Sequence, residues 1–385
     1  MRSSKRFLSL LMALFMLLSL FPASALAEEP EGGEGSIQPA EDGGVIAPVT
    51  EEDPEAPVPG EAADPDALPP PGDGLQSVDF GLSGGTLWNL YEDGTLEIKN
   101  SVLHNPMADY ENPGDAPWYQ YRDQIYTVRV GSQVSRIGNY AFYGLTKAWD
   151  FLLSSDVKEI GDHAFEGCVR LGDQPGCYGN VIGILPGSVE KIGAYAFKDC
   201  TGITSIYPLF NSTSNLKSVD VGAFSGCTGL TQAVFPGEVK SIPARCFENC
   251  TRLQSFVTTG GMTGIGSNAF EGCTGLQYAA LGSGVQYVWG GAFSGCTSLA
   301  EVKLPTSLII VGADAFSGCD LLTTVYFDGK LSGWPRVEEY ISSIGNDALL
   351  YAELVLMEDD PDHMCGDDLQ WCVYGDTLLD RKSVV

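Results

Sequence analysis

The amino-acid sequence predicts a solenoid, a fold in which short coils of chain stack along one axis and share a continuous core. Three columns of residues support this prediction. An Ala-Phe or Cys-Phe pair recurs eight times, and its phenylalanines are Phe142, Phe165, Phe197, Phe224, Phe247, Phe270, Phe293 and Phe316. Three residues after each phenylalanine comes a cysteine, except that Leu145 takes this place in the first unit. An aliphatic residue, such as Leu171 or Leu322, lies three positions further on.

The spacing of the phenylalanines defines the length of one coil. Successive steps are 23, 32, 27, 23, 23, 23 and 23 residues. A unit of 23 residues falls in the range of leucine-rich repeats, about 20–29 residues. The two longer steps place insertions at 172–180 and around 209–212. Such insertions emerge as loops that can form a binding face, or they are neutral changes of loop length.

Each unit also contains two short patterns between its phenylalanine and the next one. A short alternating run, as in Leu299, Val302 and Leu304, predicts a strand, and an Ile-Gly or Val-Gly pair closes the unit. One coil cannot bury its apolar residues alone, so the strands are expected to stack into a parallel sheet on the concave face. Short turns or helical turns are expected on the convex side. The recurring glycines are expected to allow positive φ at a tight corner.

The repeat unit resembles that of a known family. From Val311-Gly312 through Ala315-Phe316 and Gly318-Cys319 to Val325, the sequence follows the pattern IG-x-x-AF-x-GC-x-x-L-x-x-V. This pattern is similar to that of BspA-type leucine-rich-repeat surface proteins, over roughly 75–357. The resemblance implies a right-handed solenoid, secretion or surface display, and adhesion to host or neighbouring cells. It supplies no catalytic residues.

The segments at either end of the array, which spans 125–327, are predicted to cap it. The N-terminal cap (75–124) contains Asp93-Gly94 between two apolar runs, which indicates a β-hairpin. The C-terminal cap (328–357) is predicted to be a short helix, because its apolar residues have helical spacing. These residues are Trp334, Val337, Ile341 and Ile344. The tail (358–385) repeats the order of residues in the first hairpin, like the start of a second module.

The N-terminal residues 1–27 have the pattern of a signal peptide. Arg2, Lys5 and Arg6 precede an apolar run, and Ala25-Leu26-Ala27 offers a cleavage site. The alternative is an uncleaved membrane anchor. Residues 28–74 hold fourteen acidic residues and no Lys or Arg, and they predict a disordered acidic Pro/Gly-rich linker. We expect a secreted protein with no membrane span in the mature chain, whether or not it attaches to a cell surface.

Composition and chemistry argue against nucleic-acid binding and catalysis. The formal net charge of −29 disfavours a nucleic-acid partner. Of the three histidines, His163 occupies a repeat turn where other units carry Tyr195 or Asn268, so it is expected to be a tolerant surface site. The G-x-S-x-G match at 81–85 precedes a hairpin instead of forming a strand-to-helix turn. We therefore expect no enzyme, no cofactor and no metal.

The cysteine column is expected to hold buried free thiols. Stacked strands lie about 4.8 Å apart, whereas a disulfide needs its two Cβ atoms about 3.8 Å apart and pointing at each other. Cys246, which replaces the alanine before Phe247, is also expected in the core. The pairing of Cys177, Cys365 and Cys372 stays open.

The candidate binding site is the exposed face of the sheet, where two side chains per strand point away from the core. This face carries few charges for so acidic a chain, and exposed apolar clusters tend to mark partner sites. The candidate residues are Leu152, Ile182, Ile184, Tyr207, Val234, Tyr278 and Tyr326. The expected partners are proteins or glycoproteins of host or neighbouring cells. Two alternatives remain: these residues merely suit strands, or the array is a scaffold or stalk.

Overall fold

The computed structural model describes residues 74–100, 106–172, 185–206, 215–235, 238–258, 261–329, 341, 344–357, 371–374 and 377–380. All of them belong to one compact unit, Asp66–Val385. The predicted signal peptide and linker lie outside the described residues, and so does Cys177. Within the described part of the chain, no helix is both long enough and apolar enough to span a membrane.

The N-terminal cap is an antiparallel meander of three strands. They are β1 (Ser77–Ser83), β2 (Thr86–Tyr91) and β3 (Thr95–Asn100). The predicted hairpin at Asp93-Gly94 joins β2 to β3, and Gly94 adopts a φ of 81° that favours glycine. The third strand, β3, pairs in parallel with β4 (Thr127–Val130), so the meander passes directly into the array.

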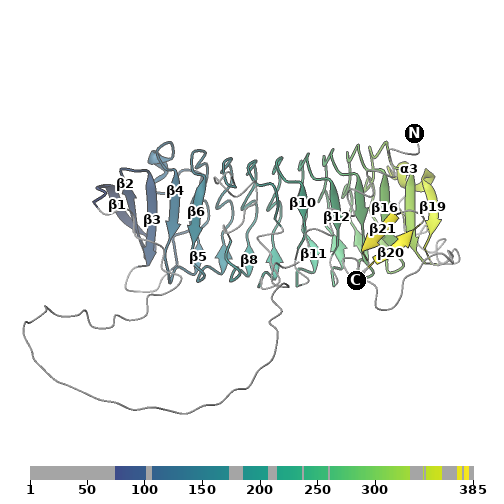
Figure 1. Ribbon diagram of the computed structural model, residues 1–385, viewed down its shortest axis with the longest axis horizontal. Helices are drawn as coiled ribbons and strands as arrows, with labels where there is room; N and C mark the ends of the chain where they lie inside the picture. Colours follow the sequence, from purple (N-terminus) through teal and green to yellow (C-terminus); the bar gives the residue numbers. More distant parts are fainter. Residues whose placement is uncertain are drawn as a thin grey trace, which may run out of the picture. The chain divides into compact units, whose positions relative to one another are not determined.

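The parallel sheet predicted from the repeats is confirmed (Figure 1), and we call it the long-strand sheet. After β4 come β6 (Asp150–Leu153), β10 (Gln232–Ala233), β12 (Ser255–Val257), β14 (Tyr278–Ala280), β16 (Glu301–Pro305), β18 (Thr324–Asp328) and β19 (Glu353–Leu356). Among the described residues its strands pair in two groups, one that ends at β6 and one that runs from β10 to β19, and Ser205 adds a parallel bridge to Gln232 of β10. The last strand, β19, lies in a segment where the sequence predicted a helical cap and no strand.

A second parallel sheet, which the sequence analysis missed, runs along the same coils, and we call it the short-strand sheet. It consists of two-residue strands that end at the Ile or Val before each core phenylalanine, and in five of the eight a glycine follows. They are β5 (Arg136–Ile137), β7 (Glu159–Ile160), β8 (Lys191–Ile192), β9 (Ser218–Val219), β11 (Ser241–Ile242), β13 (Gly264–Ile265), β15 (Tyr287–Val288) and β17 (Ile310–Val311). The order is β5-β7-β8-β9 and, separately, β11-β13-β15-β17.

Pro243 explains the break between β9 and β11. In the neighbouring coils the residue after each short strand donates its N–H to the strand before, as Gly266 does to Ile242 O at 2.8 Å and Asp220 to Ile192 O at 2.9 Å. Proline has no N–H, so it cannot donate this bond to Val219. The sheet is therefore divided at this coil.

The core contains a ladder of the eight recurring phenylalanines. All are buried, and neighbouring rings have centroids 5.1–5.9 Å apart. Trp118 ends the ladder at the N-terminal side, 6.1 Å from Phe142, and its Nε1 donates to Ala141 O at 2.7 Å. The predicted burial of the phenylalanine column is thus confirmed.

The seven column cysteines and Cys246 are free and buried, as predicted. Each column thiol donates a hydrogen bond to the carbonyl of the phenylalanine one coil earlier, at 3.0–3.2 Å. Burial raises the pKa of the Cys168 and Cys273 thiols from 9.0 to about 12. These thiols therefore stay protonated and act as donors between coils.

Two kinds of glycine recur, and only one has the predicted positive φ. Gly167 and Gly272, which precede column cysteines, adopt φ of 76° and 71°. The glycines of the Ile-Gly pairs are instead required by close approach between coils. A Cβ on Gly161 would lie 2.7 Å from Asn139 N, and a Cβ on Gly312 would lie 2.5 Å from Gly290 N.

The C-terminal cap differs from its prediction at the described residues. The short helix α3 lies at Asp347–Tyr351, after the residues expected to form it. Ile341 instead forms a parallel bridge with Val311, and Ile344 is exposed. Trp334 and Val337 lie outside the described residues. The helical spacing failed here because Ile341 continues the short-strand sheet, where pairing with the preceding coil decides the conformation.

Asn346 closes the last coil. In the array the N–H of each earlier phenylalanine donates to the carbonyl of the residue before the next core phenylalanine, as Phe293 does to Ala315 O at 2.7 Å. Phe316 donates instead to Asn346 Oδ1 at 3.0 Å, and Asn346 Nδ2 donates to Gly312 O at 2.9 Å. A buried side-chain amide oxygen thus takes the place of the backbone carbonyl that accepts this bond elsewhere in the array. In the tail, β20 (Trp371–Tyr374) and β21 (Thr377–Asp380) form an antiparallel hairpin.

Candidate functional site

The outer face of the long-strand sheet carries two rows of side chains, because alternate residues of each strand point away from the core. Strand register places Gln232, Ser255, Tyr278, Glu301, Thr324 and Glu353 in the first row. The second row contains Val257, Ala280, Lys303, Tyr326 and Val355. At the N-terminal end, Asp150 lies beside Thr127, and Leu152 lies beside Arg129.

The structure places four of the seven candidate residues on this face. Leu152, Val234, Tyr278 and Tyr326 are half-buried, in register with their expected rows. Tyr278 and Tyr326 lie on β14 and β18, with β16 between them. Ile182, Ile184 and Tyr207 lie outside the described residues.

Three other positions that the alternation assigned to the open face are buried. Ser205, Ala280 and Lys303 have relative exposures of 7%, 0% and 5%. Ala280 lies between Val257 and Lys303 in the register. Lys303 Nζ lies 3.5 Å from Asp328 Oδ2, so its charge is balanced within the protein. Alternation gives the direction of a side chain but not how much its neighbours cover it.

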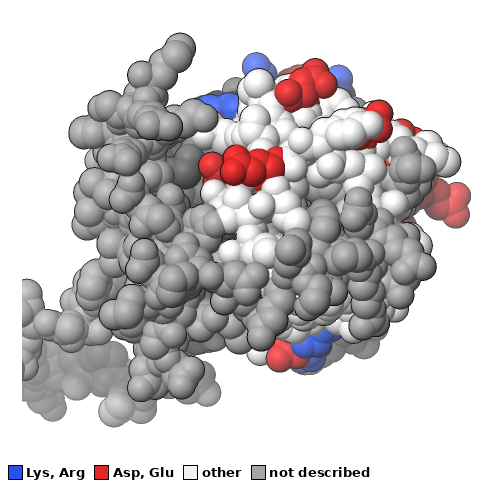
Figure 2. Space-filling view, turned by 90° about the vertical axis from the view of Figure 1, so that its right-hand side faces the viewer, with Lys and Arg blue, Asp and Glu red and all other residues white. Residues whose placement is uncertain are grey.

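The charges on this face are of both signs and nearly balance: Asp150, Glu301 and Glu353 are acidic, and Arg129 and Lys303 are basic. Burial raises the pKa of the Tyr278 phenol, and the nearby Glu301 and Tyr326 raise it further. Burial also raises the pKa of Asp150, although Arg129 opposes the shift. Figure 2, which looks at the end of the stack that carries β19, shows separate charged groups among uncharged atoms in the described part of the surface.

The same face extends onto the N-terminal cap, where sequence analysis missed an apolar group. Leu82 pairs with Leu87 across β1 and β2, and Leu87 pairs with Lys99 across β2 and β3. The group consists of Val78, Phe80, Leu82 and Leu87, and Phe80 is 74% exposed. The alternation of apolar residues in 77–83 was a signal that could have revealed it.

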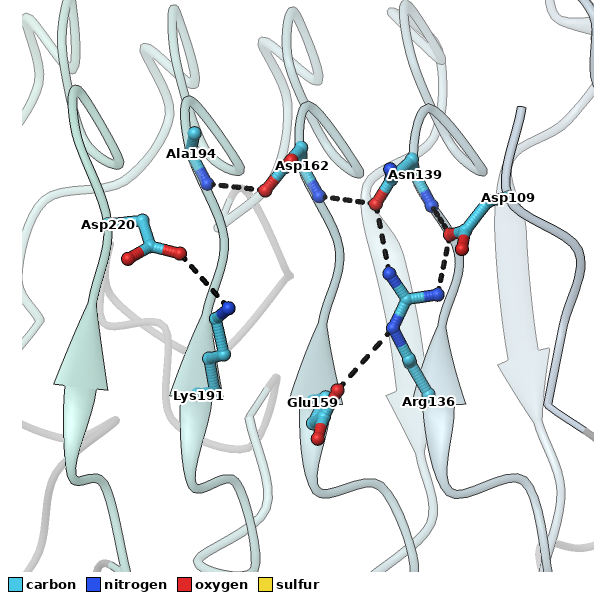
Figure 3. A network of polar contacts seen from close by, with 8 residues as sticks. All are labelled: Asp109, Arg136, Asn139, Glu159, Asp162, Lys191, Ala194 and Asp220. Carbon is cyan, nitrogen blue, oxygen red and sulfur yellow. Dashed lines mark hydrogen bonds and ion pairs between the residues drawn. The ribbon is translucent and has the colours of Figure 1, made fainter. Parts of the chain in front are cut away.

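The short-strand sheet carries a polar ladder on its first coils (Figure 3). Asn139 N donates to Asp109 Oδ1, Asp162 N to Asn139 Oδ1, and Ala194 N to Asp162 Oδ1, each at 2.8 Å. Arg136 bonds to Asp109 and Asn139, and its Nε lies 3.5 Å from Glu159. Although burial alone would raise the pKa of Asp109, the Asn139 N–H and the Arg136 guanidinium lower it. The ladder satisfies backbone donors between coils, so it has a structural role.

The groups that could have suggested catalysis also have structural roles. His163 stacks between Tyr140 and Tyr195, with centroids 4.6 and 5.2 Å away, and its Nδ1 pairs with Glu166. This stacking means that His163 is less free than the tolerant surface site predicted. Ser83, in the G-x-S-x-G match, is buried and shares a 2.7 Å hydrogen bond with the Tyr110 hydroxyl. Within the described residues, no three His, Cys, Asp or Glu side chains form a group suited to a metal ion.

Stacked coils of 23 residues, with a phenylalanine ladder and a parallel sheet, define a leucine-rich-repeat solenoid. The model of the family described as "BspA type Leucine rich repeat region" matches residues 117–174, 180–288 and 263–336, in six copies. The chain belongs to this BspA-type leucine-rich-repeat family. A search of curated proteins found no match.

Solved structures with some likeness are also leucine-rich-repeat proteins. One from Eubacterium ventriosum is 21% identical over 66% of this chain and 73% of that chain, with a TM-score of 0.40. One from T. pallidum is 22% identical over 74% of this chain and 99% of that chain, with a TM-score of 0.37. A leucine-rich cell surface protein from Faecalibacterium prausnitzii is 18% identical over 68% and 98% of the two chains, with a TM-score of 0.23.

Proposed function

We propose that this protein is a secreted or surface-displayed recognition module that binds a protein or glycoprotein of a host or neighbouring cell. The outer face of the long-strand sheet is the binding surface, and no catalytic step is involved. The observation that carries the proposal is the character of this face: in a chain of net charge −29, its rows hold apolar and aromatic side chains, and its charges are of both signs and nearly balance.

Several features support recognition over a purely structural role. Tyr278 and Tyr326 offer aromatic area together with a polar hydroxyl, a combination favoured at interfaces. Backbone pairing on both sides fixes β14 and β18, so the tyrosines are held in place before a partner arrives. Val257 and Val355 add apolar area in the same row as Tyr326. The signal-peptide pattern at 1–27 supports export of the mature chain.

The test is binding of the purified protein to an array of immobilised extracellular-matrix proteins and mucins. A double variant, Tyr278→Ala with Tyr326→Ala, should lose at least about 2 kcal/mol of binding free energy, because interface tyrosines are frequent hot spots. Tyr351→Ala is the matched control, since Tyr351 is exposed on α3 and belongs to neither row of this face. Unfolding midpoints establish that all variants are folded.

A scaffold or stalk is the second candidate. It predicts that the folded protein binds nothing on the array, or that a bound partner has the same affinity for the double variant as for the parent chain. Either result would contradict recognition by the long-strand sheet.

A further inference from the structure

The outward side chains of the short-strand sheet change character along the stack. Six residues before the core phenylalanine, the first three coils carry Arg136, Glu159 and Lys191, which belong to the network of Figure 3. The following coils carry Ser218, Ser241, Gly264, Tyr287 and Ile310 at this position. The later half of this face is therefore uncharged at this position, and it contains an exposed tryptophan.

Tyr287 and Trp289 form a pair of near-parallel aromatic rings. Their centroids are 5.8 Å apart and their planes differ by 10°. The tryptophan is 46% exposed, while Tyr287 is half-buried. The backbone beneath them is fixed on both sides, because Trp289 N donates to Ile265 O at 3.0 Å and Gly312 N donates to Val288 O at 2.8 Å.

Glycines leave the space beside this pair open. Gly266 and Gly312 occupy the position equivalent to Trp289 in the two neighbouring coils, and Gly264 pairs with Tyr287. The coils approach so closely at Gly266 and Gly312 that only glycine fits there. A Cβ on Gly266 would lie 2.5 Å from Ala244 N, and a Cβ on Gly312 would lie 2.5 Å from Gly290 N. Neither flanking coil therefore places a side chain beside the indole at this position.

The fold does not need a tryptophan here. The other seven units carry Gly138, Gly161, Gly193, Asp220, Pro243, Gly266 and Gly312 at the same position. The side chain exposes much of its apolar surface to water, which gives little stability. An exposed tryptophan with the near-parallel ring of Tyr287 beside it offers a surface that suits a ligand with an apolar face.

We propose that Tyr287 and Trp289 form a stacking platform for a sugar ring of a neutral polysaccharide. The C–H groups on one face of a pyranose carry partial positive charge and suit the negative face of an aromatic ring. Gln286, which precedes Tyr287 on the same coil, and Thr263, one coil earlier, are uncharged; the Gln286 amide can hydrogen-bond to hydroxyl groups, and the Thr263 hydroxyl, which donates to Lys240 O, can accept from them. The net charge of −29 disfavours an anionic sugar.

The size of the site also favours a sugar over a protein partner. A stable protein interface covers about 800 Å² on each side and needs a central anchor surrounded by a rim. Two aromatic rings beside glycines offer much less, but they match the small apolar face of one or two sugar rings. This platform lies on the short-strand sheet, so the proposal does not depend on the recognition surface of the long-strand sheet.

The experiment is affinity electrophoresis of the full chain in native gels containing one of four soluble neutral polysaccharides: hydroxyethyl cellulose, mixed-linkage β-glucan, xylan or mannan. We expect at least one to retard the protein. Trp289→Ala should weaken the association roughly tenfold, Tyr287→Ala should weaken it less, and Trp289→Phe should keep part of it. Tyr351→Ala, the exposed-aromatic control, should be retarded like the parent chain.

The platform would be disproved if none of the four polysaccharides retards the parent chain, or if Trp289→Ala is retarded equally. A third outcome would also overturn it: no polysaccharide retards the parent chain, but Trp289→Ala abolishes the binding of a protein ligand. The pair would then be a site for a protein partner. The double variant Tyr278→Ala with Tyr326→Ala should still be retarded, and this result separates the platform from the long-strand sheet. Unfolding midpoints in urea verify that the variants are folded.

Discussion

Single residues connect consecutive coils through hydrogen bonds from a column of buried thiols. Cys273 donates to Phe247 O at 3.0 Å, and burial raises the pKa of its thiol from 9.0 to about 12. In the unfolded chain the thiol ionises near its ordinary pKa, whereas in the folded protein it keeps its proton. Its contribution to stability is therefore complete below pH 9 and is lost as the pH rises from about 9 to about 12.

This linkage predicts a pH dependence that a single substitution should reduce. Between about pH 9.5 and 11.5 the free energy of unfolding should fall with pH, and each thiol contributes about 1.4 kcal/mol per pH unit. Cys273→Ala should reduce the slope by about this amount, measured by urea unfolding at several pH values. Comparison with the parent chain removes the contribution of lysines and tyrosines. An unchanged slope would show that the Cys273 thiol ionises alike in the folded and unfolded states.

The phenylalanine ladder predicts a large loss of stability from one truncation. Phe270 lies between Phe247 and Phe293, at centroid distances of 5.3 and 5.1 Å, and it is fully buried. Phe270→Ala should cost about 3–5 kcal/mol, because the rigid stack leaves a cavity. Phe80→Ala, at a 74% exposed position, should change stability by no more than about 0.5 kcal/mol. Chemical denaturation measures both, and equal losses would contradict the ladder as the main core.

The strands of the two sheets differ in how many interactions hold each of them in place. The long strands bury alternate side chains, as β18 does, so both hydrogen bonds and apolar contacts hold them. Each two-residue strand buries one Ile or Val but pairs through only a few N–H groups, and one proline is enough to interrupt their sheet at Pro243. Ends of the stack lack a neighbouring coil, so a cap must supply the missing hydrogen bonds.

The C-terminal cap gives a prediction for one amide. Asn346→Ala would leave the N–H of Phe316 and the carbonyl of Gly312 without their present partners at the end of the stack. We expect a loss of about 1–3 kcal/mol in the free energy of unfolding. Asp347→Ala, at an exposed position in the first turn of α3, is the control and should cost about 1 kcal/mol or less. A loss for Asn346→Ala no larger than that of the control would argue against this capping role.

Across the whole molecule, each coil pairs only with the coils next to it in the sequence. A local defect should therefore stay local. Amide hydrogen exchange of Asn346→Ala tests this expectation. Exchange should accelerate at Gly312 and Phe316, near the cap, and should be unchanged at Phe165, six coils away. Uniform acceleration along the array would instead indicate one cooperative unit.

The sequence by itself determined the features that repeat. The phenylalanine and cysteine columns, the parallel sheet and the hairpin at Asp93-Gly94 could all be predicted, because each has a local signal that recurs or has a known turn chemistry. The direction of Leu152, Val234, Tyr278 and Tyr326 on the open face followed from the two-residue period of a strand. These predictions needed no knowledge of which coils touch.

Only the tertiary structure decided the features that depend on contacts between coils. Two-residue strands are too short for a periodic signal, so the short-strand sheet and its break at Pro243 were hidden. The role of Asn346 depends on its place beside Phe316 in the segment after the last repeat, and the burial of Ala280 is seen only once the coils are stacked. The open space beside Trp289 likewise comes from glycines 23 residues away on either side. A repeat pattern defines one coil, whereas caps and sites form where neighbouring coils differ.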